Sequence, residues 1–379
     1  MDFVLYLVLI LLFTKIAGHV SVRFGQPAVL GKLLVGIILG PAVLGWIQDG
    51  SFIHQFAEIG VLLLMFIAGL ETDMDQLQKN WKPAFAVAVG GIILPFVGGY
   101  GVGELFGMSQ GHALFLGVLF SATSVSISVQ VLKEMNQLNS REATTILGAA
   151  VVDDVLVVIL LAVLTSFLGT GADVSLGLVI GKKLLFFIGV FVAGWLIVPR
   201  VLKWLSNIRV TEPVIATALV VCFAFAYFGE LMGMAGIIGA FAAGLAISQT
   251  PFKHHVEQKI EPIAYSIFVP VFFISIGLNV SFEGVGSQIG FLMVLTVCAV
   301  ITKLVGGAFG ARLTGFNMRS SLAIGSGMVS RGEVALIIAA TGLQAGLLLP
   351  QYFTSVIITI ILTTLIAPPM LKVMFMLNG

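Results

Sequence analysis

The chain of 379 residues is 59% hydrophobic and only 10% charged, whereas a soluble domain carries about 25% charged residues. This composition excludes a soluble globular protein and predicts an all-α polytopic membrane protein. The net charge of +1 argues against a nucleic-acid partner. Cys222 and Cys298 both lie in apolar runs, which favours buried structural thiols over a disulfide or a metal site.

Long apolar segments follow one another along the whole sequence. A helix needs about 20 apolar residues to cross the bilayer core, and by this measure we predict about 13 transmembrane helices. They are expected at 3–20, 28–47, 55–71, 83–106, 112–133, 143–168, 177–199, 212–230, 233–249, 260–280, 288–311, 319–345 and 350–374. The first lacks a basic n-region and a cleavage site, so we interpret it as a span and not as a signal peptide. We expect no soluble C-terminal domain.

Basic residues fall in every second connection between these spans. They begin at Arg23 and continue to Arg319, and the connections in between carry almost none apart from Lys182 and Lys183. The positive-inside rule then predicts a multi-pass protein of the cell membrane, with the N-terminus outside and the C-terminus in the cytoplasm. An odd number of spans agrees with this orientation.

The sequence matches itself at an offset of 208 residues. The matches are Gly69-Leu70 with Gly277-Leu278, Gly98-Gly99 with Gly306-Gly307, Gly107 with Gly315, Leu114 with Leu322, and Gly117 with Gly325. Gly103 breaks the series, because it falls on Ala311. The third predicted span falls on the tenth, and a shift of seven spans gives the copies opposite orientations. Inverted repeats are typical of secondary transporters, whose binding sites lie at the midplane on helices broken at matching positions.

Polar residues interrupt two of the predicted spans. The first interruption is SATSVSIS at 121–128, and the second is GSGMVSRGEV at 325–334. The offset places 122–124 on 330–332. Ser and Thr can satisfy backbone groups that are freed when a membrane helix unwinds, although small residues also serve ordinary helix packing. Because the interruptions are equivalent, we predict two discontinuous helices.

Charged residues also lie well inside predicted spans, and each is a functional-site hypothesis that needs a partner. They are Asp153, Asp154, Lys303, Arg331 and Glu333. The structural alternative is that these charges only pair to hold helices together. That alternative accounts for one aspartate and one lysine, but not for two adjacent aspartates facing one lysine.

Asp153 and Asp154 point about 100° apart on a helix, so they cannot chelate one ion from a single face. One can reach Lys303 on a neighbouring helix while the other faces a water-filled cavity. Burial and ion pairing act in opposite directions on protonation, so such a site can exchange protons near neutral pH. A carboxylate with hydroxyl groups nearby can instead bind a monovalent cation. Competition of the two ions for one carboxylate is sufficient for antiport.

Several motifs together resemble the bacterial cation:proton antiporter-2 family. They are AAVVDDV (149–155), the break ATSVSIS (122–128), ITKLVGG (301–307), SRGEV (330–334) and the segment LLMFIAGLETD that ends at Asp73. The branch most similar to this sequence consists of sodium/proton(-potassium) antiporters associated with spore germination. The resemblance covers essentially the whole chain.

The resemblance implies a sodium/proton-antiporter fold in which two discontinuous helices cross. It also implies a core domain at about 83–168 and 288–374, and a dimerisation domain at about 1–71 and 177–280. Family members of this kind are homodimers that work by an elevator-like motion in the lipid bilayer. They are transporters and not enzymes, and they need no cofactor.

Site residues can be carried over by position. Asp154 resembles the carboxylate that binds a proton or Na⁺ or K⁺, and Asp153 resembles the partner of Lys303. Thr123 and Ser124 match the unwound segment that lines the site. The residues that match the supports of the crossing are Ser126, Arg331 and Glu333. This chain departs from its relatives at two positions. Gated potassium-efflux systems have Gln where this chain has the first carboxylate, Asp153, and some sodium antiporters have Pro where it has Ser330.

The sequence therefore predicts a secondary active antiporter that exchanges protons for Na⁺ or, as the alternative, for K⁺. Both ions use oxygen ligands, so the sequence leaves this choice open. A cation channel is a remote alternative, because channels tend to repeat filter loops around a symmetry axis. An intramembrane aspartyl protease would need its two carboxylates on separate helices, and here they are adjacent.

Overall fold

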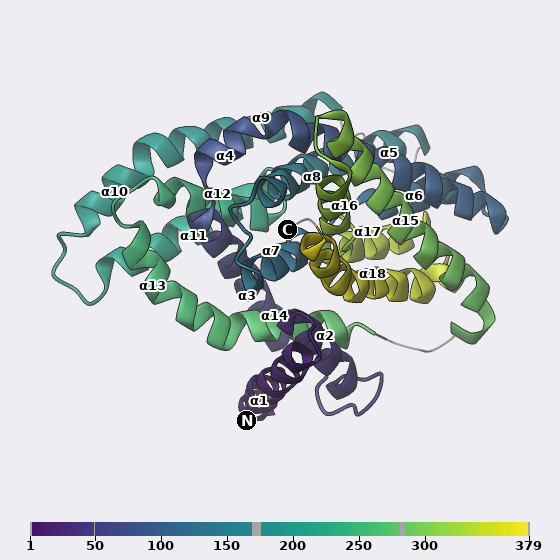
Figure 1. Ribbon diagram of the computed structural model, residues 1–379, viewed down its shortest axis with the longest axis horizontal. Helices are drawn as coiled ribbons and strands as arrows, with labels where there is room; N and C mark the ends of the chain where they lie inside the picture. Colours follow the sequence, from purple (N-terminus) through teal and green to yellow (C-terminus); the bar gives the residue numbers. More distant parts are fainter. Residues whose placement is uncertain (1, 49, 169–175, 281–284, 378–379) are drawn as a thin grey trace. The chain divides into compact units, whose positions relative to one another are not determined.

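A computed structural model of the chain describes residues 2–48, 50–168, 176–280 and 285–377 (Figure 1). This part of the chain is helical and contains no β-strand. The helices are α1 (Asp2–Arg23), α2 (Ala28–Leu39), α3 (Ser51–Glu71), α4 (Met74–Lys79), α5 (Trp81–Leu105), α6 (Gln110–Ser121), α7 (Val125–Glu134), α8 (Arg141–Leu168), α9 (Leu176–Val192), α10 (Val198–Leu205), α11 (Pro213–Leu231), α12 (Gly236–Ser248), α13 (Lys253–Ile263), α14 (Val269–Leu278), α15 (Ile289–Leu313), α16 (Met318–Gly327), α17 (Glu333–Gln344) and α18 (Pro350–Met376). Short π-helical turns join α9 to α10 and α13 to α14, and a 3₁₀ turn, η3 (Val285–Gln288), precedes α15.

The prediction of an all-α membrane protein is confirmed. Ten helical segments of the described chain are long and apolar enough to cross a membrane, and three shorter apolar helices lie at Ala28–Leu39, Gly236–Ser248 and Val334–Leu343. The count of 13 full spans is therefore not confirmed. The short helices are about 15–20 Å long at 1.5 Å per residue, less than the roughly 30 Å of a hydrocarbon core.

Contacts divide the chain into two compact units. The first comprises Met1–Leu12, Gly50–Asp75 and Ser175–Phe273, and the second comprises Phe13–Asp49, Gln76–Val174 and Ile274–Gly379. All five intramembrane charges singled out in the sequence belong to the second unit. The division into a core and a dimerisation domain stays a prediction.

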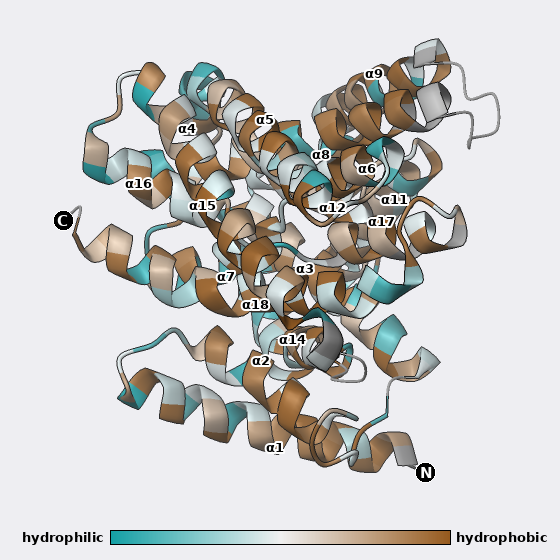
Figure 2. Cartoon of the chain, turned by 90° about the vertical axis from the view of Figure 1, so that its right-hand side faces the viewer, coloured by the Kyte–Doolittle hydropathy of each residue, from teal (hydrophilic) through white to brown (hydrophobic). Residues whose placement is uncertain are grey.

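Helices α5 and α15 pack closely along each other in the second unit (Figure 1). Both are apolar over most of their length, as the brown colouring in Figure 2 shows. A Cβ atom at Gly306 would overlap the carbonyl oxygen of Gly90, and one at Gly310 would overlap that of Ala86. The backbones of these two helices are therefore in direct contact, which requires glycine at these positions.

The internal repeat is visible in equivalent glycine contacts. A Cβ at Gly99 would lie 2.9 Å from the Cα of Gly117, where α5 meets α6. At the positions 208 residues later, a Cβ at Gly307 would lie 3.0 Å from the Cα of Gly325, where α15 meets α16. The same pair of glycines thus sets the same close helix approach in each copy.

The repeat extends further towards the N-terminus than the sequence matches indicated. In the second unit, Gly36 of α2 packs against the backbone of Ile274 in α14. In the first unit, Gly244 of α12 packs against the backbone of Phe66 in α3. The offset of 208 exchanges these two contacts, because it carries 36 to 244 and 66 to 274. Corresponding positions of the two copies therefore make corresponding contacts.

Both predicted breaks are present, and they confirm the two discontinuous helices. The first separates α6 from α7 at 122–124, and the second separates α16 from α17 at 328–332. Neither α7 nor α17 has a side-chain N-cap, so the unwound segments leave backbone groups that other residues must satisfy.

Candidate functional site

The two breaks contact each other directly through their backbones. The Ser124 N–H donates to the carbonyl oxygen of Ser330 at 2.8 Å, and the Ser330 hydroxyl donates to the carbonyl oxygen of Ser124 at 2.7 Å. A Cβ at Gly332 would lie only 2.5 Å from Ser124 Oγ. The unwound segments therefore cross at close range, and each satisfies polar groups of the other.

Two further hydroxyl groups hold the ends of the crossing. The Ser128 hydroxyl of α7 donates to the carbonyl oxygen of Gly327, the last residue of α16, at 2.5 Å. The Thr364 hydroxyl of α18 donates to the carbonyl oxygen of Arg331. Because all of these groups are buried, each bond prevents a cost of about 1–3 kcal/mol for an unsatisfied polar group.

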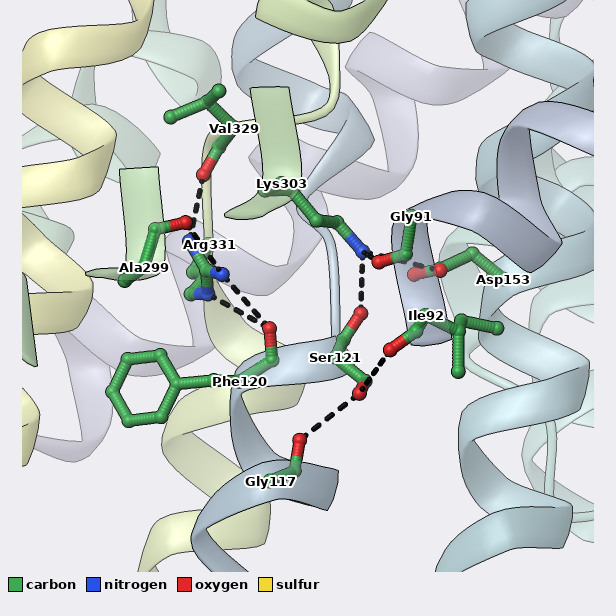
Figure 3. Close-up of polar contacts among 10 residues, drawn as sticks. All are labelled: Gly91, Ile92, Gly117, Phe120, Ser121, Asp153, Ala299, Lys303, Val329 and Arg331. Atoms are coloured by element: carbon green, nitrogen blue, oxygen red, sulfur yellow. Dashed lines mark hydrogen bonds and ion pairs between the residues drawn. The ribbon is translucent and has the colours of Figure 1, made fainter. Parts of the chain in front are cut away.

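Lys303 lies at the centre of the site and is completely buried. Its ammonium group donates to the carbonyl oxygens of Gly91 at 2.6 Å and Ser121 at 2.5 Å (Figure 3). Its third contact is the Asp153 carboxylate, with 3.2 Å between Nζ and Oδ1. An ammonium group has three donors, so α5, α6 and α8 together satisfy it.

Arg331, in the second break, is also completely buried. Its guanidinium group donates twice to the carbonyl oxygen of Phe120, at 2.8 and 3.2 Å, and once to that of Ala299, at 3.1 Å (Figure 3). A fourth bond of 3.1 Å reaches Val329 in its own segment. The fork of donors thus ties the second break to α6 and α15.

The two buried cations bind the last two carbonyl groups of α6. Ser121 is the final residue of that helix and Phe120 precedes it, so both carbonyls lack an intrahelical partner. The C-terminal end of a helix carries a partial negative charge, which a cation stabilises. Lys303 and Arg331 therefore compensate the helix end that the first break creates.

Asp153 and Asp154 differ in exposure on α8. Asp153 is buried and pairs with Lys303, whereas Asp154 is partly exposed. The difference follows from the rotation of about 100° between adjacent helix residues. One carboxylate is thus fixed in an ion pair, and the other can contact mobile ions.

Three hydroxyl oxygens at the first break have no hydrogen-bond partner among the described residues. They belong to Thr123, Ser124 and Ser126, and all three atoms are buried. The Thr123 hydroxyl lies beside the Asp153 carboxylate, but without the geometry of a hydrogen bond. Open oxygens of this kind, one of them next to a carboxylate, are ligands of the type that hard cations take.

The predicted residues all lie in the second unit, in the two breaks or on α7, α8, α15 and α17. The side chain of Glu333 lies outside the described part of the chain, so its predicted support of the crossing stays a prediction. Ser126 makes no hydrogen bond to a described residue, and Ser128 and Ser330 hold the crossing instead. Both serines stand in the quoted breaks, but nothing in their spacing distinguished them from their neighbours.

Comparison with known proteins agrees with this geometry. Residues 8–377 match the family described as "Sodium/hydrogen exchanger, transmembrane". The chain belongs to this family. The resemblance seen in the motifs is therefore confirmed.

Two relatives in Bacillus cereus are each 61% identical to the chain. The Na(+)/H(+)-K(+) antiporter GerN aligns over 374 residues, which cover 99% of this chain and 96% of that protein. The probable Na(+)/H(+) antiporter GerT aligns over 375 residues, which cover 99% and 100%. Members of the family with these names are transporters, which agrees with the expectation that the chain is not an enzyme.

A solved structure shares the fold. The sodium proton antiporter MjNhaP1 from Methanocaldococcus jannaschii superposes with a TM-score of 0.66 over 97% of this chain and 96% of its own. Because only 14% of the aligned residues are identical, this likeness concerns the arrangement of helices and not the site. It supports the predicted sodium/proton-antiporter fold.

Proposed function

We propose that the chain is a secondary active antiporter that exchanges protons for Na⁺ across the cell membrane, with K⁺ as a second substrate. The observation that carries this proposal is the group of open hydroxyl oxygens at the first break, of which that of Thr123 lies beside Asp153. The names of the relatives GerN and GerT support the choice of ions.

The two ions would compete because each neutralises the same carboxylate, Asp154. A proton and a monovalent cation bound there together would leave an excess positive charge in a low-dielectric site. Binding of one ion therefore disfavours binding of the other, which couples their movements.

The proposal assigns a role to each residue of the site. Asp154 is the carboxylate that binds the proton or the cation, and Thr123 and Ser124 provide neutral oxygen ligands. Asp153 and Lys303 form the ion pair that carries the second mobile proton. Arg331 supports the crossing through the carbonyls of α6. The assembly is a homodimer that moves its site by an elevator-like motion, with the N-terminus outside and the C-terminus in the cytoplasm.

Purified protein in proteoliposomes tests this function. With an acidic lumen and a pH-sensitive fluorophore, addition of Na⁺ should dequench the fluorescence by driving protons out. The assay should be repeated with K⁺ and Li⁺ and across pH, which ranks the ions. A response that is independent of the cation, or a unitary conductance in planar bilayers, would contradict antiport.

Thr123→Val should raise the KM for the cation more than it lowers the maximal rate. Valine has the same shape but lacks the hydroxyl, and loss of one neutral ligand weakens ground-state binding without removing the titrating carboxylate. The measurement is the dependence of dequenching on cation concentration. Thr145→Val is a matched control, because the Thr145 hydroxyl bonds to the Arg141 carbonyl of its own helix. An unchanged KM in Thr123→Val would remove Thr123 from the ligand set.

A further inference from the structure

A polar face of α7 runs away from the crossing. Ser126, Gln130 and Glu134 are spaced four residues apart, so they lie one above the other on one side of the helix. At 1.5 Å per residue they cover about 12 Å, from the first break to the last residue of α7. Of these three residues, only Ser126 belongs to the site described above.

Two residues of this face are buried with an oxygen left open. Ser126 is 0% and Gln130 is 3% exposed, and neither Ser126 Oγ nor Gln130 Oε1 has a partner within the described ranges. The other end of the Gln130 amide donates to Glu134 Oε1 at 2.8 Å. A carboxylate oxygen only accepts, so this end must be the nitrogen and the amide oxygen points elsewhere. Buried oxygens of this kind are normally satisfied by water or by an ion.

The opposite side of α7 is different in character. Leu132 lies two residues beyond Gln130, about 200° around the helix, and it is 0% exposed. Ser128, on the same side, is bonded to the carbonyl oxygen of Gly327 in α16. Both sides of α7 are buried, but within the described ranges the side of Ser128 and Leu132 leaves no side-chain oxygen open, whereas the face of Ser126 and Gln130 does.

Glu134 ties the end of this face to α2. Its Oε2 accepts a hydrogen bond of 2.7 Å from the backbone N–H of Ala28, the first residue of α2. Lys32 Nζ lies 4.0 Å from its Oε1. The N-cap residue Pro27 provides no side-chain cap, so the carboxylate of another helix performs this function. A carboxylate at a helix N-terminus is stabilised by the helix dipole.

We propose that the face formed by Ser126, Gln130 and Glu134 is the route by which hydrated monovalent cations reach the crossing, and that Glu134 closes this route by capping α2. The inference rests on the proposed function. The open oxygens of Ser126 and Gln130 replace water ligands along the route. Loss of the Glu134–Ala28 bond separates the N-terminus of α2 from the end of α7 and opens the route to solvent.

Cysteine labelling tests the route without relying on transport. The background is the full chain with Cys222→Ser and Cys298→Ala, in proteoliposomes. Ser126→Cys and Gln130→Cys are compared with Leu132→Cys, using a cationic, membrane-impermeant methanethiosulfonate. Ser126→Cys changes one oxygen to sulfur and preserves the packing, so it remains informative if Gln130→Cys folds poorly. We expect the two route cysteines to react at least about tenfold faster than Leu132→Cys, because water along the route reaches the open polar atoms of Ser126 and Gln130 and not the apolar side of Leu132.

Closure is tested by adding Glu134→Gln to the same variants. Glutamine has the shape of glutamate without its charge. Loss of a charge-assisted hydrogen bond should shift the equilibrium between the closed and the open route by about tenfold or more. Labelling of Ser126→Cys should accelerate by that factor, and labelling of Leu132→Cys should not change. Equal labelling at all three positions would overturn the route, and unchanged rates in Glu134→Gln would overturn the closure.

Failure of the route can be distinguished from failure of the proposed function. Gln130→Leu should lower the maximal exchange rate and leave the KM for the cation unchanged, because it affects the route and not the ligands. If labelling is uniform while wild type still exchanges Na⁺ for protons, the route is wrong and the antiporter stands. If wild type shows no exchange while labelling follows the route, the proposed function fails alone.

Discussion

Asp154→Asn should reduce cation-dependent proton movement to the level of protein-free liposomes. Asp154 is the partly exposed carboxylate of the pair, while Asp153 is held by Lys303. Asparagine cannot take up and release a proton, so the cation loses its competitor and the two movements are uncoupled. The measurement is fluorescence dequenching after addition of Na⁺, at several pH values.

The same variant should unfold at nearly the wild-type temperature, because asparagine preserves the volume and Asp154 is not buried in the ion pair. Glu142→Gln provides the matched control, since Glu142 lies in the first turn of the same helix and should retain exchange. If purified Asp154→Asn exchanged ions at the wild-type rate, Asp154 would not be the coupling carboxylate.

Lys303→Gln should remove the response of exchange to membrane potential. If Lys303 releases Asp153 when a cation arrives, the pair carries a second mobile proton, and two protons move for each cation. Glutamine cannot carry this charge, and the unpaired Asp153 takes up a proton and remains neutral. Exchange through Asp154 then continues in an electroneutral mode. The measurement compares rates at imposed potentials set by a gradient of the permeant anion thiocyanate, with Na⁺ as the substrate, because a K⁺ gradient would drive exchange itself.

Lys303→Gln should also lower the free energy of unfolding, by about 3–5 kcal/mol for the loss of one partner of a buried ion pair. The ammonium group satisfies two carbonyls besides Asp153, and glutamine replaces at most two of its donors. Adding Asp153→Asn should recover part of this loss, because no buried carboxylate is then left unpaired. Lys182→Gln, at an exposed lysine of α9, should change neither stability nor voltage response. A wild type whose rate ignores membrane potential would refute the second mobile proton and leave antiport intact.

Much of the fold could be predicted from the sequence, because a bilayer imposes strong and simple constraints. Apolar length located the helices, and the polar interruptions located both breaks. The offset of 208 residues identified the repeat from Gly69 onwards, but not the contacts of Gly36 and Gly244. Gly36 and Gly244 match at this offset in the sequence, but only the packed helices show that they make corresponding contacts.

The charged members of the site were also predictable, since an intramembrane charge needs a partner. Asp153 and Lys303 are 150 residues apart, and the structure places them 3.2 Å apart. The roles of Ser128 and Ser330 could not be predicted, because each donates to a backbone carbonyl. A carbonyl group is present at every residue, so the sequence gives no sign of which one a side chain will bind.

The binding of Lys303 and Arg331 to the last carbonyls of α6 has a consequence for sequence comparison. The acceptors belong to the backbone of Phe120 and Ser121, so any residue at these two positions presents the same oxygen. At Phe120 the side chain also matters, because its ring lies 5.2 Å from the Arg331 guanidinium. A substitution at Ser121 leaves the acceptor of Lys303 in place, so a search for co-varying positions among relatives would miss this contact, although it holds a buried cation in place.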